Sequence, residues 1–163
     1  MKRAYGFTIV ELIVVIVVIA ILAAIAIVGF AWVRDDAMDT KIRATADSVG
    51  KAVSTHFLKA GTPIENGFLH GGATSPKINA KEAVKPYLPA DFMKGIKSRN
   101  VNVSTGVFKY WNCTNGGFAI FASLNNPSSD DLASYTAAIN NCPAPAATVS
   151  TSGYTYNYAK MFN

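Results

Sequence analysis

Residues 6–33 read GFTIVELIVVIVVIAILAAIAIVGFAWV. From Leu12 to Val33 this stretch holds 22 residues without a charge. At ~1.5 Å per residue such a helix is about 33 Å long, which matches the hydrocarbon core of a bilayer. A lone segment in lipid must satisfy its own backbone hydrogen bonds, so we expect a helix in spite of the many Ile and Val residues. Trp32 and Arg34 follow where an interfacial anchor would lie.

Three kinds of N-terminal segment compete for this apolar block. It could be a secretory signal cleaved near Ala24-Ile25-Ala26, a plain membrane anchor, or a leader that is cut ahead of the helix. Lys2 and Arg3 predict a cytoplasmic N-terminus and an exported remainder in each case. Gly6 and Phe7 precede the apolar run, so a peptidase could cut there and leave the helix intact.

Glu11 favours the third alternative. A carboxylate within an apolar membrane segment is costly and is therefore a candidate functional residue. A secretory signal or a generic anchor has no use for it. The stretch from Gly6 to Leu12 closely resembles the signature of type IV pilins and type II secretion pseudopilins: a short basic leader ending in Gly, then Phe, Thr, two hydrophobic residues, Glu and an apolar run. The resemblance covers Met1 to about Phe30.

The resemblance implies a role for three residues. Gly6 would precede the bond cut by the prepilin peptidase on the cytoplasmic face. Phe7 would become the new N-terminus and be N-methylated. Glu11 would neutralise the N-terminal amine of a neighbouring subunit, in a homo-oligomeric helical filament built by inner-membrane assembly machinery.

The chemistry of Glu11 also supports this role independently. Cleavage after Gly6 creates a cationic amine at Phe7, and Glu11 lies one helical turn farther on. Its carboxylate can reach its own amine or that of an axially offset subunit, and a charge buried without a partner is strongly penalised. Family members often carry Pro or Gly within the helix, whereas here only Gly29 weakens it.

An amphipathic pattern follows the apolar block. Apolar residues recur at helical spacing, which predicts one continuous helix over residues 7–60: Met38, Ile42, Val49, Val53, Phe57 and Ala60. Charged residues are expected on the other faces: Asp35, Asp36, Asp39, Lys41, Arg43, Asp47, Lys51 and Lys59. Asp39 with Arg43, and Asp47 with Lys51, are favourable pairs four residues apart. The Gly61-Thr62-Pro63 sequence ends the helix.

The remaining residues predict a small globular domain. A loop at 61–78 is followed by a short helix at 81–87, and strands are expected at 101–103, 107–111 and 117–124. The Asn115-Gly116 pair predicts a hairpin between the last two strands. Ser128 and Asp131 approximate a capping box at the start of a helix that runs to about residue 140. The tyrosines of residues 154–158 predict a last strand.

The expected fold class is α+β, a long N-terminal helix packed on a small antiparallel sheet, as in the pilin fold that the resemblance implies. The expected divisions are a leader at 1–6, a membrane and filament-core helix at 7–33, an amphipathic continuation at 34–60 and a globular domain at 61–163.

The two cysteines, Cys113 and Cys142, both fall in the part expected outside the membrane. An even count in an exported domain predicts a disulfide; the alternative is two free buried thiols. A bridge would close a loop of about 30 residues, and the chain-entropy model gives such a loop about 3–4 kcal/mol of stabilisation.

Charge and motifs argue against several other functions. The formal net charge is +5, but the basic residues are scattered, so DNA as a partner has no support from the charge pattern. His56 is expected to be a packed residue of the amphipathic helix, and His70 has no nearby ligand cluster. No phosphate loop or dinucleotide fingerprint appears, so we expect no cofactor, no metal and no enzymatic activity.

The favoured hypothesis is a subunit of a type IV pilus that serves adhesion, twitching motility or DNA uptake. Such a chain would be a single-pass inner-membrane precursor and then part of an extracellular filament. The first alternative is a pseudopilin of a type II secretion or competence apparatus. The second is a membrane-tethered binding or enzymatic domain with a borrowed leader.

Overall fold

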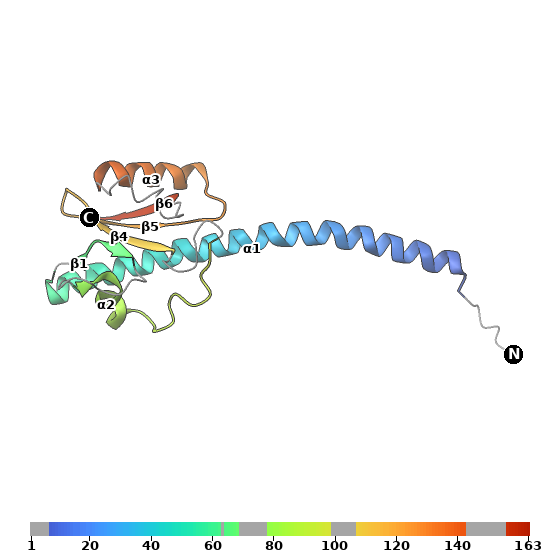
Figure 1. Cartoon of the computed structure of the whole chain (residues 1–163), viewed down its shortest axis with the longest axis horizontal. Helices are drawn as coiled ribbons and strands as arrows, with labels where there is room; N and C mark the ends of the chain where they lie inside the picture. The colour runs from blue at the N-terminus through green and yellow to red at the C-terminus, as the bar shows by residue number, and fades with distance from the viewer. Residues whose placement is uncertain (1–6, 63, 69–77, 99–106, 143–155) are drawn as a thin grey trace. The chain divides into compact units, whose positions relative to one another are not determined.

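A computed structural model of the chain describes residues 7–62, 64–68, 78–98, 107–142 and 156–163. The chain divides into two compact units, Met1–Asp35 and Asp36–Asn163. The helix α1, Ile9–Ala60, contributes its first part to one unit and its second part to the other (Figure 1). The second unit is called the head unit below.

The described residues of the first unit are Phe7, Thr8 and the part of α1 up to Asp35. The large apolar side chains described in this unit are exposed, from 49 % at Val15 to 84 % at Phe7. Gly29 lies within the helix and has no neighbouring atoms within 4 Å of the position where a Cβ would be. By length and composition α1 could cross a membrane, which agrees with the predicted span.

The head unit contains a four-stranded antiparallel sheet. Its strands are β2 (Gly67–Phe68), β4 (Phe108–Asn112), β5 (Phe118–Ala122) and β6 (Tyr158–Phe162), in the spatial order β2-β4-β5-β6. The strands β4 and β5 form the hairpin that the Asn115-Gly116 pair predicts, with Tyr110 opposite Ile120. A separate parallel pair joins β1 (Ile64–Glu65) to β3 (Ile78–Asn79).

Besides α1, the described part of the head unit contains two short helical segments and a longer helix. The short helix α2 (Ala80–Val84) and the 3-10 turn η1 (Lys85–Tyr87) occupy the predicted helical stretch. The helix α3 (Ser129–Asn141) begins with the predicted capping box, in which Ser128 and Asp131 satisfy each other's backbone N–H groups. The α+β class and the long helix packed on an antiparallel sheet are therefore confirmed.

The sheet is buried on both faces because a helix covers each one. Phe118, Ile120 and Ala122 belong to the core that includes the inward side chains of α1, whereas Ala119 and Phe121 pack in a second core with residues of α3. Figure 1 shows α3 and the head part of α1 on opposite sides of the strands. All five residues of β5 are consequently buried, which explains why its sequence is continuously apolar rather than alternating.

The predicted stripe of α1 is largely correct. Ile42, Val49 and Val53 are fully buried in the core, and Met38 and Phe57 pack against it. Ala60, the last residue of α1, is exposed, so its place in the stripe was wrong. Gly61 adopts a positive φ of 60° and its N–H bonds to the carbonyl of Phe57, which ends the helix as predicted.

Three expectations about charged residues of α1 were wrong. Asp35 and Asp39 are buried rather than on a solvated face. Arg43 forms an ion pair with Asp131 of α3, at 2.6 Å, in place of the predicted pair with Asp39. Contacts with the β5–α3 connection and with α3 outweigh helical spacing at Asp39 and Arg43. The predicted pair of Asp47 with Lys51 is present at 2.6 Å.

The last strand lies later than expected. The strand β6 begins at Tyr158, where the predicted strand ended. Tyr156 precedes it as a buried residue whose ring lies edge-on to Phe121, so this tyrosine packs against the sheet. The predicted strand at 101–103 and the residues 154–155 lie outside the described part of the chain.

Candidate processing and assembly site

The N-terminal end of α1 carries the described residues of the predicted processing site. Gly6 lies outside the described residues, so the geometry begins at Phe7, whose side chain is 84 % exposed. The Thr8 backbone N–H and the Thr8 hydroxyl both donate to Oε2 of Glu11, each at 2.8 Å. In return, the Glu11 backbone N–H donates to Oγ1 of Thr8 at 3.2 Å.

This reciprocal arrangement is a capping box. Thr8 directly precedes the helix and Glu11 is its third residue, which is the spacing at which the two side chains satisfy each other's backbone N–H groups. From sequence, Glu11 was expected only as an assembly residue, and no role was expected for Thr8. The Thr-x-x-Glu spacing was the signal that could have found this cap.

The geometry leaves one carboxylate oxygen of Glu11 able to accept a further hydrogen bond. Both bonds from Thr8 end on Oε2, so Oε1 remains an open acceptor as far as the described residues are concerned. A carboxylate can accept hydrogen bonds on both oxygens at once. Glu11 can therefore cap its own helix and at the same time accept a bond from a cationic group outside this chain.

The surroundings of this site consist of exposed apolar side chains. Ile9 is 79 % exposed and Leu12 is 60 % exposed on either side of Glu11. An apolar surface of this extent needs a cover of lipid or protein, because soluble monomers rarely expose large contiguous apolar patches. The site is thus built for a membrane or for packing against other helices.

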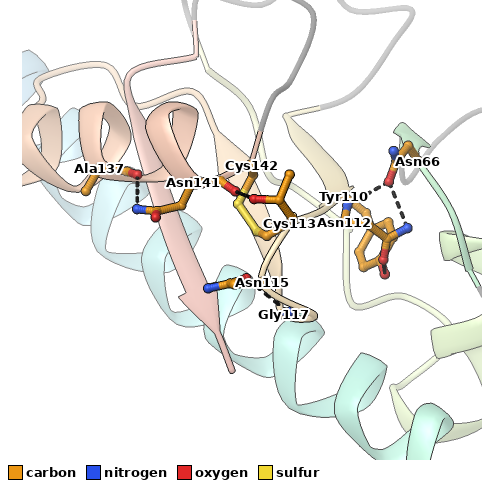
Figure 2. The surroundings of a disulfide bond; sticks show 10 residues. Asn66, Tyr110, Asn112, Cys113, Asn115, Gly117, Ala137, Asn141 and Cys142 are labelled. Carbon is orange, nitrogen blue, oxygen red and sulfur yellow. Dashed lines mark hydrogen bonds between the residues drawn. A yellow bond between two sulfur atoms is a disulfide. The ribbon is translucent and has the colours of Figure 1, made fainter.

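The second candidate feature is the disulfide in the head unit. Cys113 follows β4 and Cys142 caps the C-terminal end of α3, and the two form a disulfide (Figure 2). Thr114 reinforces the same junction, because its N–H and its hydroxyl both donate to the carbonyl of Asn141, at 3.2 and 3.0 Å. The end of α3 is therefore fixed to the β4–β5 hairpin.

Asn112, beside this disulfide, begins one of the two glycosylation triplets in the sequence. Its side-chain amide donates to the Ile64 carbonyl at 3.0 Å and to Oδ1 of Asn66 at 2.9 Å, and its Oδ1 accepts from the Tyr110 hydroxyl. These bonds tie β4 to the segment before β2, so in the folded head Asn112 has a structural role. The other triplet begins at Asn102, which lies outside the described residues.

Two acidic residues fix the start of α3. Asp39 accepts hydrogen bonds from the backbone N–H groups of Asn125 and Asn126, both at 2.7 Å, and from the Asn125 side chain at 3.0 Å. Asp131 accepts two bonds from the Arg43 guanidinium, at 3.0 and 2.6 Å. Burial raises the pKa of Asp131, but the bonds from Arg43 and Ser128 outweigh burial and lower this pKa to about 2.

The structure gives no support to a catalytic or metal site in the described part of the chain. Among those residues there is no group of three or more His, Cys, Asp or Glu side chains that could hold a metal ion. His56 is buried beside Phe57 and Tyr87, and its Nε2 lies 2.9 Å from the Thr62 hydroxyl, so it is a packed residue as expected.

The comparisons bear on the N-terminal end alone. Residues 1–27 match the family model described as the prokaryotic N-terminal methylation motif. The comparisons with curated proteins and with solved structures give no match for the chain. The motif spans Phe7, Thr8 and Glu11, the residues whose geometry is described above, and it implies processing by a prepilin peptidase. The chain therefore carries the prepilin leader, and this motif supports a type IV pilin-like or pseudopilin subunit.

Proposed function

We propose that this chain is a structural subunit of a type IV pilus filament, made as a single-pass inner-membrane precursor and assembled after cleavage between Gly6 and Phe7. In this proposal residues 1–6 are the leader, 7–33 the membrane and filament-core helix, 34–60 its amphipathic continuation and 61–163 the globular domain. The subunit acts by packing with copies of itself and performs no catalysis. Adhesion, twitching motility and DNA uptake are the activities such a filament would serve.

The observation that carries the proposal is the open Oε1 of Glu11 within an exposed apolar helix. Cleavage would create a positive amine at Phe7, four residues before Glu11. In a bundle of such helices that amine needs an anionic partner, because an unpaired buried charge is strongly unfavourable. Glu11 of an adjacent copy supplies one, and the pair would set the axial register of neighbouring subunits, as a buried polar residue does in a coiled coil.

The capping box permits a test that separates two roles of Glu11. Glu11→Gln keeps an acceptor for Thr8 and so preserves the cap, but it removes the charge. Glu11→Ala removes both. We expect both variants to be cleaved normally, with Phe7 at the mature N-terminus, and both to give far fewer filaments than the parent chain when sheared fibres are quantified. Filament yield restored to the parental level by Glu11→Gln would show that capping, not charge pairing, is what assembly requires.

The leader is tested by Gly6→Val. The peptidase is expected to need a small residue at the cut, so this variant should accumulate as uncleaved precursor in the membrane. N-terminal sequencing or mass spectrometry reads the result directly, and a normal Phe7 terminus in this variant would contradict the assignment. Long fibres made mainly of this chain support the pilus role, whereas loss of protein export on deletion without visible fibres would favour a pseudopilin.

A further inference from the structure

The head unit contains two identical Asn-Gly pairs in different surroundings, Asn66-Gly67 and Asn115-Gly116. In such a pair the backbone nitrogen of the glycine can attack the side-chain amide of the asparagine. Glycine permits this reaction because it has no Cβ to obstruct the approach and adopts many backbone conformations. The two pairs therefore form an internal comparison within one fold.

Asn115 lies at the turn of the β4–β5 hairpin. Both Asn115 and Gly116 are exposed, and Gly116 has a positive φ of 88°. The Asn115 Oδ1 accepts one hydrogen bond of 3.2 Å, from the N–H of Gly117 in the same turn (Figure 2). Its side chain is thus held only to its own loop as far as the described residues show, and water reaches it.

Asn66 is held by a different element. Its Oδ1 accepts from the backbone N–H of Asn112 at 2.7 Å and from the Asn112 side chain at 2.9 Å, so β4 fixes its orientation (Figure 2). The following residue, Gly67, is paired with Tyr110 in the sheet. The attack of the Gly67 nitrogen on the Asn66 side chain would form a five-membered ring. For this ring to close, the side chain must leave both hydrogen bonds and the backbone must leave its strand.

We propose that Asn115 is a site of spontaneous deamidation and that Asn66 is protected from the same reaction by its bonds to Asn112. The Gly116 nitrogen attacks Cγ of Asn115, a new C–N bond forms, the Cγ–Nδ2 bond breaks, and ammonia leaves with the proton that Gly116 loses. Water then opens the succinimide at either carbonyl, which gives an aspartyl or an isoaspartyl residue at position 115. No enzyme or oxidant is required.

Both products change the charge of the β4–β5 turn, whose two ends are fixed. Either one adds a negative charge at the turn, and the isoaspartyl product also adds one carbon to the backbone. The turn has fixed ends, because the Cys113 N–H bonds to the Gly117 carbonyl at 2.8 Å and Cys113 is joined to Cys142. The modification therefore alters the charge and shape of an exposed surface of the head while its anchors stay in place.

The test uses the full chain, folded in detergent with its disulfide intact and incubated at mildly alkaline pH. After reduction and trypsin digestion, Asn66 lies in peptide 60–77 and Asn115 in peptide 110–160, so fragment ions separate the two sites. Asn115 is expected to deamidate at least about tenfold faster than Asn66, because Asn66 must first lose two hydrogen bonds of ordinary strength. Asn115→Gln should abolish the fast reaction, and Asn66→Gln should leave it unchanged.

A second arm removes the fold. In the reduced chain unfolded by denaturant, the two Asn-Gly pairs should react at nearly equal rates, which would show that structure causes the difference. Equal rates in the folded chain, a faster reaction at Asn66, or no measurable reaction at Asn115 would each overturn the proposal. None of these outcomes depends on filament assembly.

Discussion

Replacing Gly50 by alanine is expected to destabilise the head unit, although alanine is the better helix former. Gly50 lies in the buried stretch of α1, and a Cβ at this position would overlap the ring of Phe162 at the end of β6. That ring is stacked on Phe118 with 5.0 Å between centroids, so it cannot move away without losing a packed aromatic contact.

The magnitude follows from two opposing effects. Inserting a methyl group into a packed site costs about 1–3 kcal/mol, whereas exchanging glycine for alanine in a helix interior contributes about 1 kcal/mol of stability. We therefore expect Gly50→Ala to lower the free energy of unfolding by up to about 2 kcal/mol. In a Phe162→Ala background the overlap is absent, and Gly50→Ala should instead raise this free energy by up to about 1 kcal/mol.

The assay is urea unfolding of the full chain in detergent, followed by near-ultraviolet circular dichroism without reductant. Ser48→Ala is the matched control, because Ser48 is an exposed residue of the same helix and its substitution should have the same small effect with or without Phe162. If Gly50→Ala has the same sign in both backgrounds, the close approach of α1 to Phe162 does not limit packing at this position.

Three further predictions concern the polar and covalent ties of α3. Asp39→Ala should lower the free energy of unfolding by about 1–3 kcal/mol in the same urea assay, since the part-buried backbone N–H groups of Asn125 and Asn126 lose a charged acceptor; a loss no larger than that of an ordinary surface substitution would refute this. The pKa of Asp131 is lowered from 3.8 to about 2, so its bonds from Arg43 and Ser128 should together contribute up to about 2 kcal/mol above pH 4 and lose this contribution as pH falls from about 4 to about 2; Asp131→Asn should flatten that part of the stability profile. Cys142→Ser should cost about 2–5 kcal/mol and leave Cys113 reactive toward a thiol reagent in the unfolded chain.

Local signals predicted much of this molecule. The apolar run of α1, the Asn115-Gly116 turn and the Ser128 cap each depend on residues close in sequence, and the structure contains the elements they indicate. The continuous apolar character of β5 likewise reflects its burial on both faces. The prepilin leader is recognisable for the same reason, because its pattern lies within one short segment.

What sequence could not predict depends on residues far apart in the chain. Arg43 is separated by 88 residues from Asp131, so spacing along α1 pointed to the wrong partner. Asp39 looks like a surface residue until the β5–α3 connection folds over it. The requirement for glycine at position 50 arises from Phe162, and no pattern of neighbouring residues predicts such a contact. Thr8 differs from these, because its signal was local and was overlooked.

The disulfide has a mechanical consequence. Cys113 and Cys142 are 29 residues apart along the chain, and the bridge makes the segment between them a closed ring. If the chain were pulled by its two ends, the segment within that ring could not extend while the disulfide is intact. The extended length of the unfolded chain would then be shorter by about 100 Å, at ~3.5 Å for each of the 29 residues. A single protease cut within the ring would likewise release no fragment, so a nicked subunit would keep its full mass until a reductant opened it.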